Sequence, residues 1–272
     1  MHVIGISDLT RDYGQGKGIF RLSFTIEEGE VFGFLGPNGA GKTTTIRHLM
    51  GFLRPRQGSC TIRGMDCWRQ AEQIQKDLGY IPGELTLFEE MDGREYLTFL
   101  QRYRGMTNAG RAPELMERFE LDPRGKIKKM SKGMKQKLGI VAAFMHSPRT
   151  LILDEPTSGL DPLMQNRFVE LIREEKQRGA TILMSSHMFE EVERTCDRIG
   201  IIRAGHLVAL DSTQALRQRH VRSYTVTLES DAAAAAFARD FGGQAQGNQA
   251  TVCVRRSLEE IFLEQYGQEV KE

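Results

Sequence analysis

A glycine-rich segment that follows a short apolar run is the feature that most constrains this chain. Gly36–Thr43 reads GPNGAGKT and matches GxxxxGK[ST], a pattern whose glycines let backbone N–H groups close around phosphate oxygens. The apolar run Val31–Leu35 precedes it and the helical stretch Thr44–Met50 follows, which is the strand-to-helix context that the pattern requires. A glycine turn beside an unrelated lysine is the alternative, and this context makes it the weaker interpretation. The segment predicts a site for nucleotide phosphates.

Two side chains of this phosphate loop have direct roles in the prediction. Lys42 would bridge the β- and γ-phosphates as a point charge, and Thr43 would offer its hydroxyl to Mg²⁺. Lys42 is therefore a candidate catalytic residue and Thr43 a candidate metal ligand. The candidate nucleotide-binding residues of the loop are Gly36, Pro37, Asn38, Gly39, Ala40, Gly41, Lys42, Thr43 and Thr44.

Two carboxylates end a second apolar run. Leu151–Leu153 reads as a buried strand, and Asp154 and Glu155 follow it directly. A Mg²⁺-nucleotide site needs carboxylates at the carboxyl end of a sheet, so Asp154 is a candidate metal ligand acting through water. Glu155, one position on, is a candidate general base for the attacking water. The pair could instead end a strand before Pro156, but the phosphate loop favours the catalytic interpretation.

The remaining apolar patterns predict the organisation of the chain. Residues 1–35 are β-rich, residues 84–148 are mostly helical, and residues 150–210 alternate short apolar runs with amphipathic helices, as parallel βα units do. The predicted fold class is α/β: a phosphate-loop NTPase core with a mostly parallel sheet, an N-terminal antiparallel β subdomain, an inserted helical subdomain and a small α+β C-terminal appendage. We expect the domain boundary at residue 218, with the appendage over residues 219–272.

Two helices are expected in the appendage. The alanine-rich helix follows Asp231, which is predicted as its N-cap. The second helix begins at Ser257, which forms a capping box with Glu260.

Composition excludes several classes of function. The 37 basic and 36 acidic residues leave a formal charge of +1, so the chain as a whole does not attract polyanions. The basic segment Arg124–Lys137 lacks interleaved aromatic residues, and no nucleic-acid partner is expected. The four cysteines and six histidines form no zinc-ligand spacing, which indicates reduced, structural thiols. No apolar run is long enough to cross a bilayer and no signal peptide is expected.

Two further segments resemble motifs of the ABC ATPases. Met130–Lys137 reads MSKGMKQK and resembles the LSGGQ signature, and Ser158–Asp161 resembles the D-loop. Tyr13 lies where that family has an adenine-stacking aromatic, and His187 lies where it has a switch histidine. The motifs occur in the family's order and the resemblance covers about the first 215 residues.

This resemblance implies the remaining site residues and both cofactors. ATP and Mg²⁺ are the implied cofactors, and His187 joins Glu155 and Lys42 as a catalytic residue. In the family, the signature helix of one subunit faces the γ-phosphate held by the phosphate loop of the other. Two ATP molecules are thus sandwiched in a dimer, which here would be a homodimer. The residues implied to bind nucleotide outside the phosphate loop are Tyr13, Ser131, Gly133 and Asp161.

The resemblance also implies a function. The chain would be the ATP-binding and ATP-hydrolysing subunit of an ABC transporter that drives a separate membrane permease, and so would lie at the cytoplasmic face of the plasma membrane. Its tail is similar to that of the bacterial drug, antibiotic and sodium exporters, which favours export. Leu85, Leu87 and Phe88 are candidate contacts with the permease. The alternatives are a soluble ABC ATPase acting on ribosomes or DNA, and a nucleotide-binding scaffold that does not hydrolyse ATP.

The chain departs from the family pattern at three positions. The family's loop glutamine, which contacts Mg²⁺, is replaced by Gly83, and Glu84 follows it. Lys132 replaces the first glycine of the signature, and its ammonium would add attraction for phosphate. Met134 replaces the signature glutamine and cannot donate a hydrogen bond to ribose.

Overall fold

The chain divides into two compact units, Met1–Leu210 and Asp211–Glu272. The computed structural model describes residues 2–186, 188–215 and 221–255. The division falls within a strand, β10 (His206–Ser212), rather than after it at residue 218.

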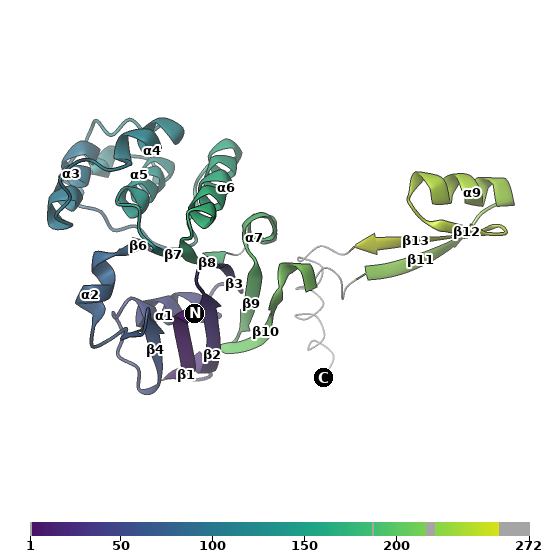
Figure 1. Ribbon diagram of the computed structural model, residues 1–272, viewed down its shortest axis with the longest axis horizontal. Helices are drawn as coiled ribbons and strands as arrows, with labels where there is room; N and C mark the ends of the chain where they lie inside the picture. The colour runs from purple at the N-terminus through teal and green to yellow at the C-terminus, as the bar shows by residue number, and fades with distance from the viewer. Residues whose placement is uncertain (1, 187, 216–220, 256–272) are drawn as a thin grey trace. The chain divides into compact units, whose positions relative to one another are not determined.

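A six-stranded sheet forms the centre of the first unit (Figure 1). Its order is β10-β9-β3-β8-β7-β6, and β3 pairs in parallel with β8 and β9, as β7 does with β8 and β6. All residues of β3 and β7 are buried, as expected of parallel strands covered on both faces. The strands are β3 (Val31–Leu35), β6 (Leu78–Ile81), β7 (Thr150–Asp154), β8 (Thr181–Ser186) and β9 (Arg198–Arg203), with β10.

An antiparallel sheet of order β2-β1-β4-β5 packs in the same core. Its strands are β1 (His2–Gly14), β2 (Lys17–Glu27), β4 (Gln57–Ile62) and β5 (Met65–Asp66). The β1–β2 turn places Gln15 and Gly16 at φ 53° and 70°, the left-handed geometry that suits a two-residue hairpin. The pairing of β1 with β2 therefore continues to the turn, up to Gly14 and Lys17.

Helices occupy the stretch between β6 and β7 and the faces of the central sheet. In Figure 1 α3, α4 and α5 form a group above the central strands, with α6 beside them. Asp92 caps α3 in a reciprocal capping box with Glu95, which fixes where that helix begins. The helices are α1 (Lys42–Leu49), α2 (Ala71–Lys76), α3 (Gly93–Tyr103), α4 (Ala112–Arg118), the 3₁₀ turn Ile127–Lys129, α5 (Lys132–Phe144), α6 (Pro162–Gln177) and α7 (Phe189–Thr195).

Ion pairs join the inserted helices to α6. Arg118 on α4 holds Glu174 with two bonds of 2.6 and 2.9 Å. Glu175 is fully buried and pairs with Arg111, which precedes α4, and with Arg178 at the end of α6. A buried carboxylate requires such partners, so this contact fixes how α4 lies against α6.

The described residues of the second unit include a three-stranded sheet and the helix α9 (Asp231–Asp240). Its strands β11 (Val221–Thr227), β12 (Gln244–Gln246) and β13 (Gln249–Arg255) have the order β11-β13-β12. Ala234 and Ala238 of α9 pack against Ala250.

Helix α9 is capped one residue earlier than expected. The N-cap of α9 is Ser230, not Asp231, because the hydroxyl of extended Ser230 accepts from Ala233 N–H at 3.2 Å. The helix expected from Ser257 lies outside the described residues. The predicted fold class is confirmed: a mostly parallel α/β core with an antiparallel β subdomain, an inserted helical part and a small α+β appendage.

Candidate functional site

Three adjacent strands bring the predicted site residues together at their carboxyl ends. In the sheet register Leu35 of β3 pairs with Ser186 of β8, and Ser185 pairs with Asp154 of β7. The phosphate loop follows Leu35 and Glu155 follows Asp154, so both motifs meet at one edge of the sheet. This is the edge at which parallel α/β proteins bind ligands.

The phosphate loop is shaped by close backbone packing. A Cβ on Gly36 would lie 2.4 Å from the carbonyl oxygen of Ile202, so only glycine fits there. Gly41, the N-cap of α1, has φ 114° and supplies no side-chain cap, and the first turn of α1 has no acidic residue. The first N–H groups of this helix are thus available to an anion, and the loop fits a nucleotide's phosphates.

Lys42 points into the loop that carries it. Its Nζ donates to the carbonyl oxygens of Gly36 at 2.6 Å and Pro37 at 3.2 Å, and lies 3.6 Å from Glu155 Oε1. Burial lowers the pKa of Lys42, and the nearby carboxylates of Glu155 and Asp154 oppose this shift. Lys42 is therefore a largely desolvated cation beside the predicted phosphate position.

Thr43 and Asp154 provide converging oxygen atoms. Thr43 Oγ1 donates to Asp154 Oδ2 at 2.9 Å, and the Ser185 hydroxyl donates to Asp154 Oδ1. Asp154 is 1% exposed, so its orientation is set by these two hydroxyls. A hydroxyl and a carboxylate beside a phosphate site fit Mg²⁺, which takes few protein ligands besides phosphate and water. Within residues 2–186, 188–215 and 221–255 no cluster of three or more His, Cys, Asp or Glu could hold a metal.

Gly83 lies next to this oxygen pair. A Cβ at residue 83 would begin 3.2 Å from Asp154 Oδ2. The loop after β6 therefore passes beside Asp154, the candidate metal ligand. Because residue 83 is glycine, it offers no side chain to the metal. Glu84, the next residue, is exposed.

The backbone at Glu155 departs from the extended conformation of β7, which ends at Asp154. The φ of Glu155 is 49°, and its N–H donates to both the carbonyl and the hydroxyl oxygen of Ser185, each at 3.1 Å. The side chain is 24% exposed and approaches Lys42. A partly exposed carboxylate beside the phosphate loop has the access that a general base needs.

The signature-like motif forms a second group with the D-loop-like turn. Ser131 is the N-cap of α5 and accepts from Met134 N–H at 3.2 Å. A Cβ on Gly133 would lie 2.9 Å from the carbonyl oxygen of Gly159, and Lys132 Nζ lies 3.0 Å from Ser158 Oγ. Among the described residues no hydrogen bond or ion pair joins Ser131 or Gly133 to the phosphate loop. One chain therefore carries the two groups without direct bonds between them.

Three other predicted residues have different outcomes. Asp161 is the N-cap of α6, accepting from Met164 N–H at 3.0 Å, so it has a structural role beside its predicted one. Tyr13 is 53% exposed near the β1–β2 turn, with the Arg11 guanidinium 5.2 Å from its ring centre. His187 lies outside the described residues.

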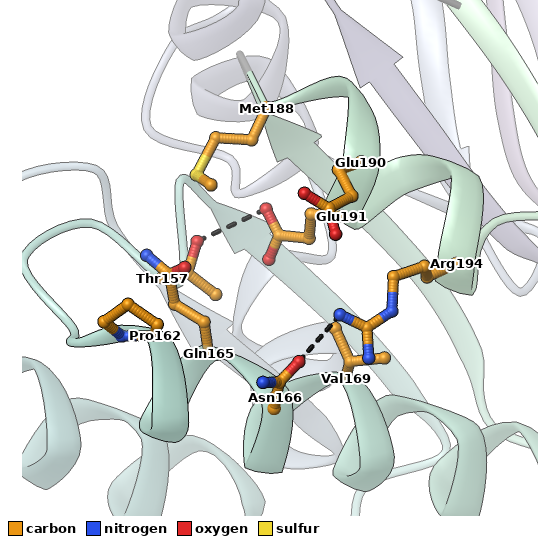
Figure 2. A pocket seen from close by; sticks show the side chains of 9 residues that line it. All are labelled: Thr157, Pro162, Gln165, Asn166, Val169, Met188, Glu190, Glu191 and Arg194. Atoms are coloured by element: carbon orange, nitrogen blue, oxygen red, sulfur yellow. Dashed lines mark hydrogen bonds between the residues drawn. The ribbon is translucent and has the colours of Figure 1, made fainter. Parts of the chain in front are cut away.

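The sequence interpretation missed Glu191. Its side chain, on α7, points toward Thr157 in the turn after Glu155, as Figure 2 shows. Glu191 Oε2 accepts from Ser186 Oγ at 2.8 Å and from Thr157 Oγ1 at 3.3 Å. Burial raises the pKa of Glu191 to about 7, which the two hydroxyls oppose. The only sequence signal is helical spacing, since Glu191 shares the buried face of α7 with Val192 and Thr195.

One finding concerns the membrane. No helix in the described part of the chain combines the length and apolar character that crossing a bilayer requires.

Comparisons with known proteins agree with this geometry. The ABC transporter family model matches residues 19–158. The linearmycin resistance ATP-binding protein LnrL of Bacillus subtilis is 37% identical over 217 residues, covering 78% of this chain and 70% of that protein. The Nod factor export ATP-binding protein I of Rhizobium etli is 36% identical over 215 residues, covering 77% of this chain and 68% of that protein.

A solved structure is similar over nearly the whole chain. It is described as the ATP-binding subunit of an ABC transporter, with a TM-score of 0.78 and 31% identity, covering 97% of this chain and 99% of that one. This chain therefore belongs to the ABC transporter family, as an ATP-binding subunit with ATPase activity.

Proposed function

We propose that two copies of this chain close around two ATP molecules, each held between the phosphate loop of one copy and α5 of the other. The observation that carries this proposal is that, among the described residues, no hydrogen bond or ion pair joins Ser131 or Gly133 to the phosphate loop. The phosphate loop lies with Asp154 and Glu155, whereas Ser131 and Gly133 lie against Gly159. A second copy would complete the site by facing its α5 N-terminus toward the bound triphosphate.

Each group has a role in hydrolysis that follows from its position. Lys42 and the first N–H groups of α1 would hold the β- and γ-phosphates, and Tyr13 would stack on the adenine. Glu155 would accept a proton from the attacking water, and His187 would contact the γ-phosphate. Thr43 and Asp154 would hold Mg²⁺, which supplies charge neutralisation between the phosphate oxygens when bound. Ser131, Gly133 and Asp161 would bind from the opposite copy.

Hydrolysis would open this dimer. Each charge-assisted hydrogen bond to phosphate contributes about 1.5–3 kcal/mol, so loss of the γ-phosphate removes several kcal/mol from the interface. Because the two copies would be joined largely through these bonds, cleavage would separate the motif groups. The separate membrane permease would convert this motion into transport at the cytoplasmic face of the membrane.

An exposed aromatic strip on the helical part suits contact with that permease. Phe88 is 53% exposed, and its ring centre lies 5.4 Å from that of Phe99, which lies 6.2 Å from that of Tyr103. Leu87, one of the expected contacts, is buried, so the strip extends along α3 instead. Exposed aromatic residues of this kind are typical of protein interfaces.

We propose export as the direction of transport. The relatives are named for linearmycin resistance and for Nod factor export, and resistance by transport requires movement away from the cytoplasm.

The experiment is steady-state ATP hydrolysis by the wild type and by Glu155→Gln, with and without a candidate permease in lipid vesicles. We expect Glu155→Gln to bind ATP but turn over at least a hundredfold more slowly, because the amide cannot accept a proton. Equal rates would contradict the role of Glu155. A permease that neither binds the chain nor changes its rate would contradict the assignment of that permease.

A further inference from the structure

The last two residues of β8 make bonds on opposite sides of the chain. Ser185 bonds to Asp154 and to Glu155 N–H, which belong to the hydrolytic site. Ser186, one residue on, turns its hydroxyl to Glu191 Oε2 at 2.8 Å. Alternate residues of a strand point to opposite faces, so β8 contacts the site through one serine and α7 through the other.

The Glu191 carboxylate joins α7 to two other segments through two hydroxyls. Thr157 Oγ1 donates to Oε2 at 3.3 Å, which attaches the turn Glu155–Ser158 to α7. Ser186 Oγ donates to Oε2 and accepts from Met188 N–H at 2.9 Å. The end of β8 and the turn that begins at Glu155 are therefore both bonded to one carboxylate.

The carboxylate is set in a largely closed environment. Glu191 is 6% exposed, and its Oε1 is buried with no hydrogen-bond partner among the described residues. A cavity of about 140 Å³ adjoins it, lined in part by Thr157, Met188 and Arg194 (Figure 2). A buried carboxylate whose second oxygen has no partner is energetically unfavourable, and α7 would pack more stably with an apolar residue there. A positioning role accounts for the presence of a carboxylate.

We propose that Glu191 is a positioning residue for ATP hydrolysis, fixing the end of β8 and the turn after Glu155 relative to each other. This inference rests on the proposed role of Glu155. Glu191 does not contact the reacting atoms: it acts through Ser186 and Thr157. Its removal would leave the phosphate loop intact and disturb only the alignment of Glu155 with the attacking water.

The charged groups near Glu191 define how the contact responds to pH. Glu155, across the turn, raises the pKa of Glu191 together with burial. Arg194 and Glu190 of α7 line the same cavity, and Arg194 is engaged by Asn166 on α6 at 2.7 Å. A carboxylate accepts hydrogen bonds more strongly than a carboxylic acid, so the contact tightens as Glu191 loses its proton near pH 7.

The test compares Glu191→Ala, Glu191→Gln and the exposed neighbour Glu190→Gln as a control. For Glu191→Ala we expect kcat to fall at least tenfold, while the affinity for Mg-ATP stays within twofold. Glu191→Gln should keep kcat within about threefold of wild type at pH 7.5, because its amide oxygen still accepts from both hydroxyls. The rise of kcat between pH 6 and 8 should flatten in Glu191→Gln and persist in Glu190→Gln.

If the Glu191→Ala protein folds poorly, a double-mutant cycle with Glu191→Gln and Thr157→Val tests the same contact. Thr157→Val alone should lower kcat several-fold, and in the Glu191→Gln background its effect should be different from its effect in wild type, since the two residues are in contact. Additive effects, unchanged kcat in Glu191→Ala, or equal losses of kcat and ATP affinity would overturn the proposal. Absence of turnover in the wild type would instead contradict the proposed function.

Discussion

At the scale of single residues, burial determines what the charged side chains of this site can do. Lys42 is 5% exposed and held by two loop carbonyls, whereas Glu155 is 24% exposed and open to a water molecule. The desolvated lysine suits binding of a fixed anion, and the more exposed carboxylate suits proton transfer. Glu191 is also a carboxylate but is 6% exposed, and in our proposal it holds other residues in place.

Lys42→Ala should weaken binding of Mg-ATP by about 30- to 100-fold. The reason is the loss of charge-assisted bonds to phosphate, each of about 1.5–3 kcal/mol. Isothermal titration calorimetry measures the change, and Lys76→Ala, at an exposed lysine paired with Glu72, is the control. Normal ATP affinity in Lys42→Ala would contradict the role given to this lysine.

Glu191→Gln should gain stability relative to wild type as pH rises from 5 to 8. The pKa of Glu191 is raised to about 7 from an ordinary 4.5, so the folded state holds a proton that the unfolded state has lost. The stability this confers is full below pH 4.5 and is lost as pH rises through about 7, a change on the order of 2–3 kcal/mol. Thermal unfolding at both pH values measures the difference, and a constant difference in Tm would exclude this titration.

At the scale of elements, side-chain contacts hold the inserted helices against α6 and the turn that precedes it. The ion pairs of Arg111 and Arg118 tie α4 to α6, and α6 begins at the D-loop-like turn through its cap, Asp161. The signature-like motif contacts the same turn through Lys132 and Gly133. The helical part and the turn after Glu155 are therefore mechanically connected on two sides.

Glu175→Ala should destabilise the chain by about 2 kcal/mol or more. The substitution leaves the partly buried Arg111 without its fully buried partner, and breaking a buried pair is strongly destabilising. Glu170, on the same helix, is 62% exposed and 3.7 Å from Arg118, so Glu170→Ala is the matched control with an expected effect below about 0.5 kcal/mol. Urea unfolding measures both, and equal effects would contradict this view of Glu175.

Gly83→Gln should lower the Mg²⁺ concentration for half-maximal ATP hydrolysis by a few-fold. A Cβ at residue 83 would lie 3.2 Å from Asp154 Oδ2, so the amide oxygen of a glutamine there would reach the metal directly or through a metal-bound water. Gly83→Ala is the control, because it tests the tight Cβ contact without the amide. If both variants show the same Mg²⁺ dependence, the loop does not reach the metal.

At the scale of the whole molecule, the proposed dimer requires the two motif groups that meet at one nucleotide to come from different copies. The near-neutral charge of +1 places no strong repulsion between two copies. The nucleotide itself would then supply much of the attraction, which makes association depend on its γ-phosphate.

Glu155→Gln with saturating Mg-ATP should elute from a sizing column at twice the 30.8 kDa of one chain, and with Mg-ADP at the mass of one chain. The variant retains the γ-phosphate, so the bonds that join the copies persist. Light scattering on the column measures the mass. A monomer under both conditions, also in the presence of permease, would contradict the ATP-dependent dimer.

Several features of this protein are determined by the sequence alone because they depend on neighbouring residues. The phosphate loop and the carboxylates at the end of β7 each occupy a short contiguous stretch. Backbone N–H groups, glycine conformations and helix caps operate within a few residues, so their patterns can be read directly. The parallel α/β core follows from the same local patterns of apolar runs.

Other features were decided by tertiary structure because their partners lie far apart in the chain. Ser186 and Thr157 reach Glu191 from separate segments, and Leu87 is buried while Phe88 is exposed. Two adjacent residues, Ser230 and Asp231, could each cap α9. The backbone geometry of the folded chain makes Ser230 the cap. Burial and long-range pairing depend on which surfaces meet, and that is set by the packing of the whole sheet and its helices.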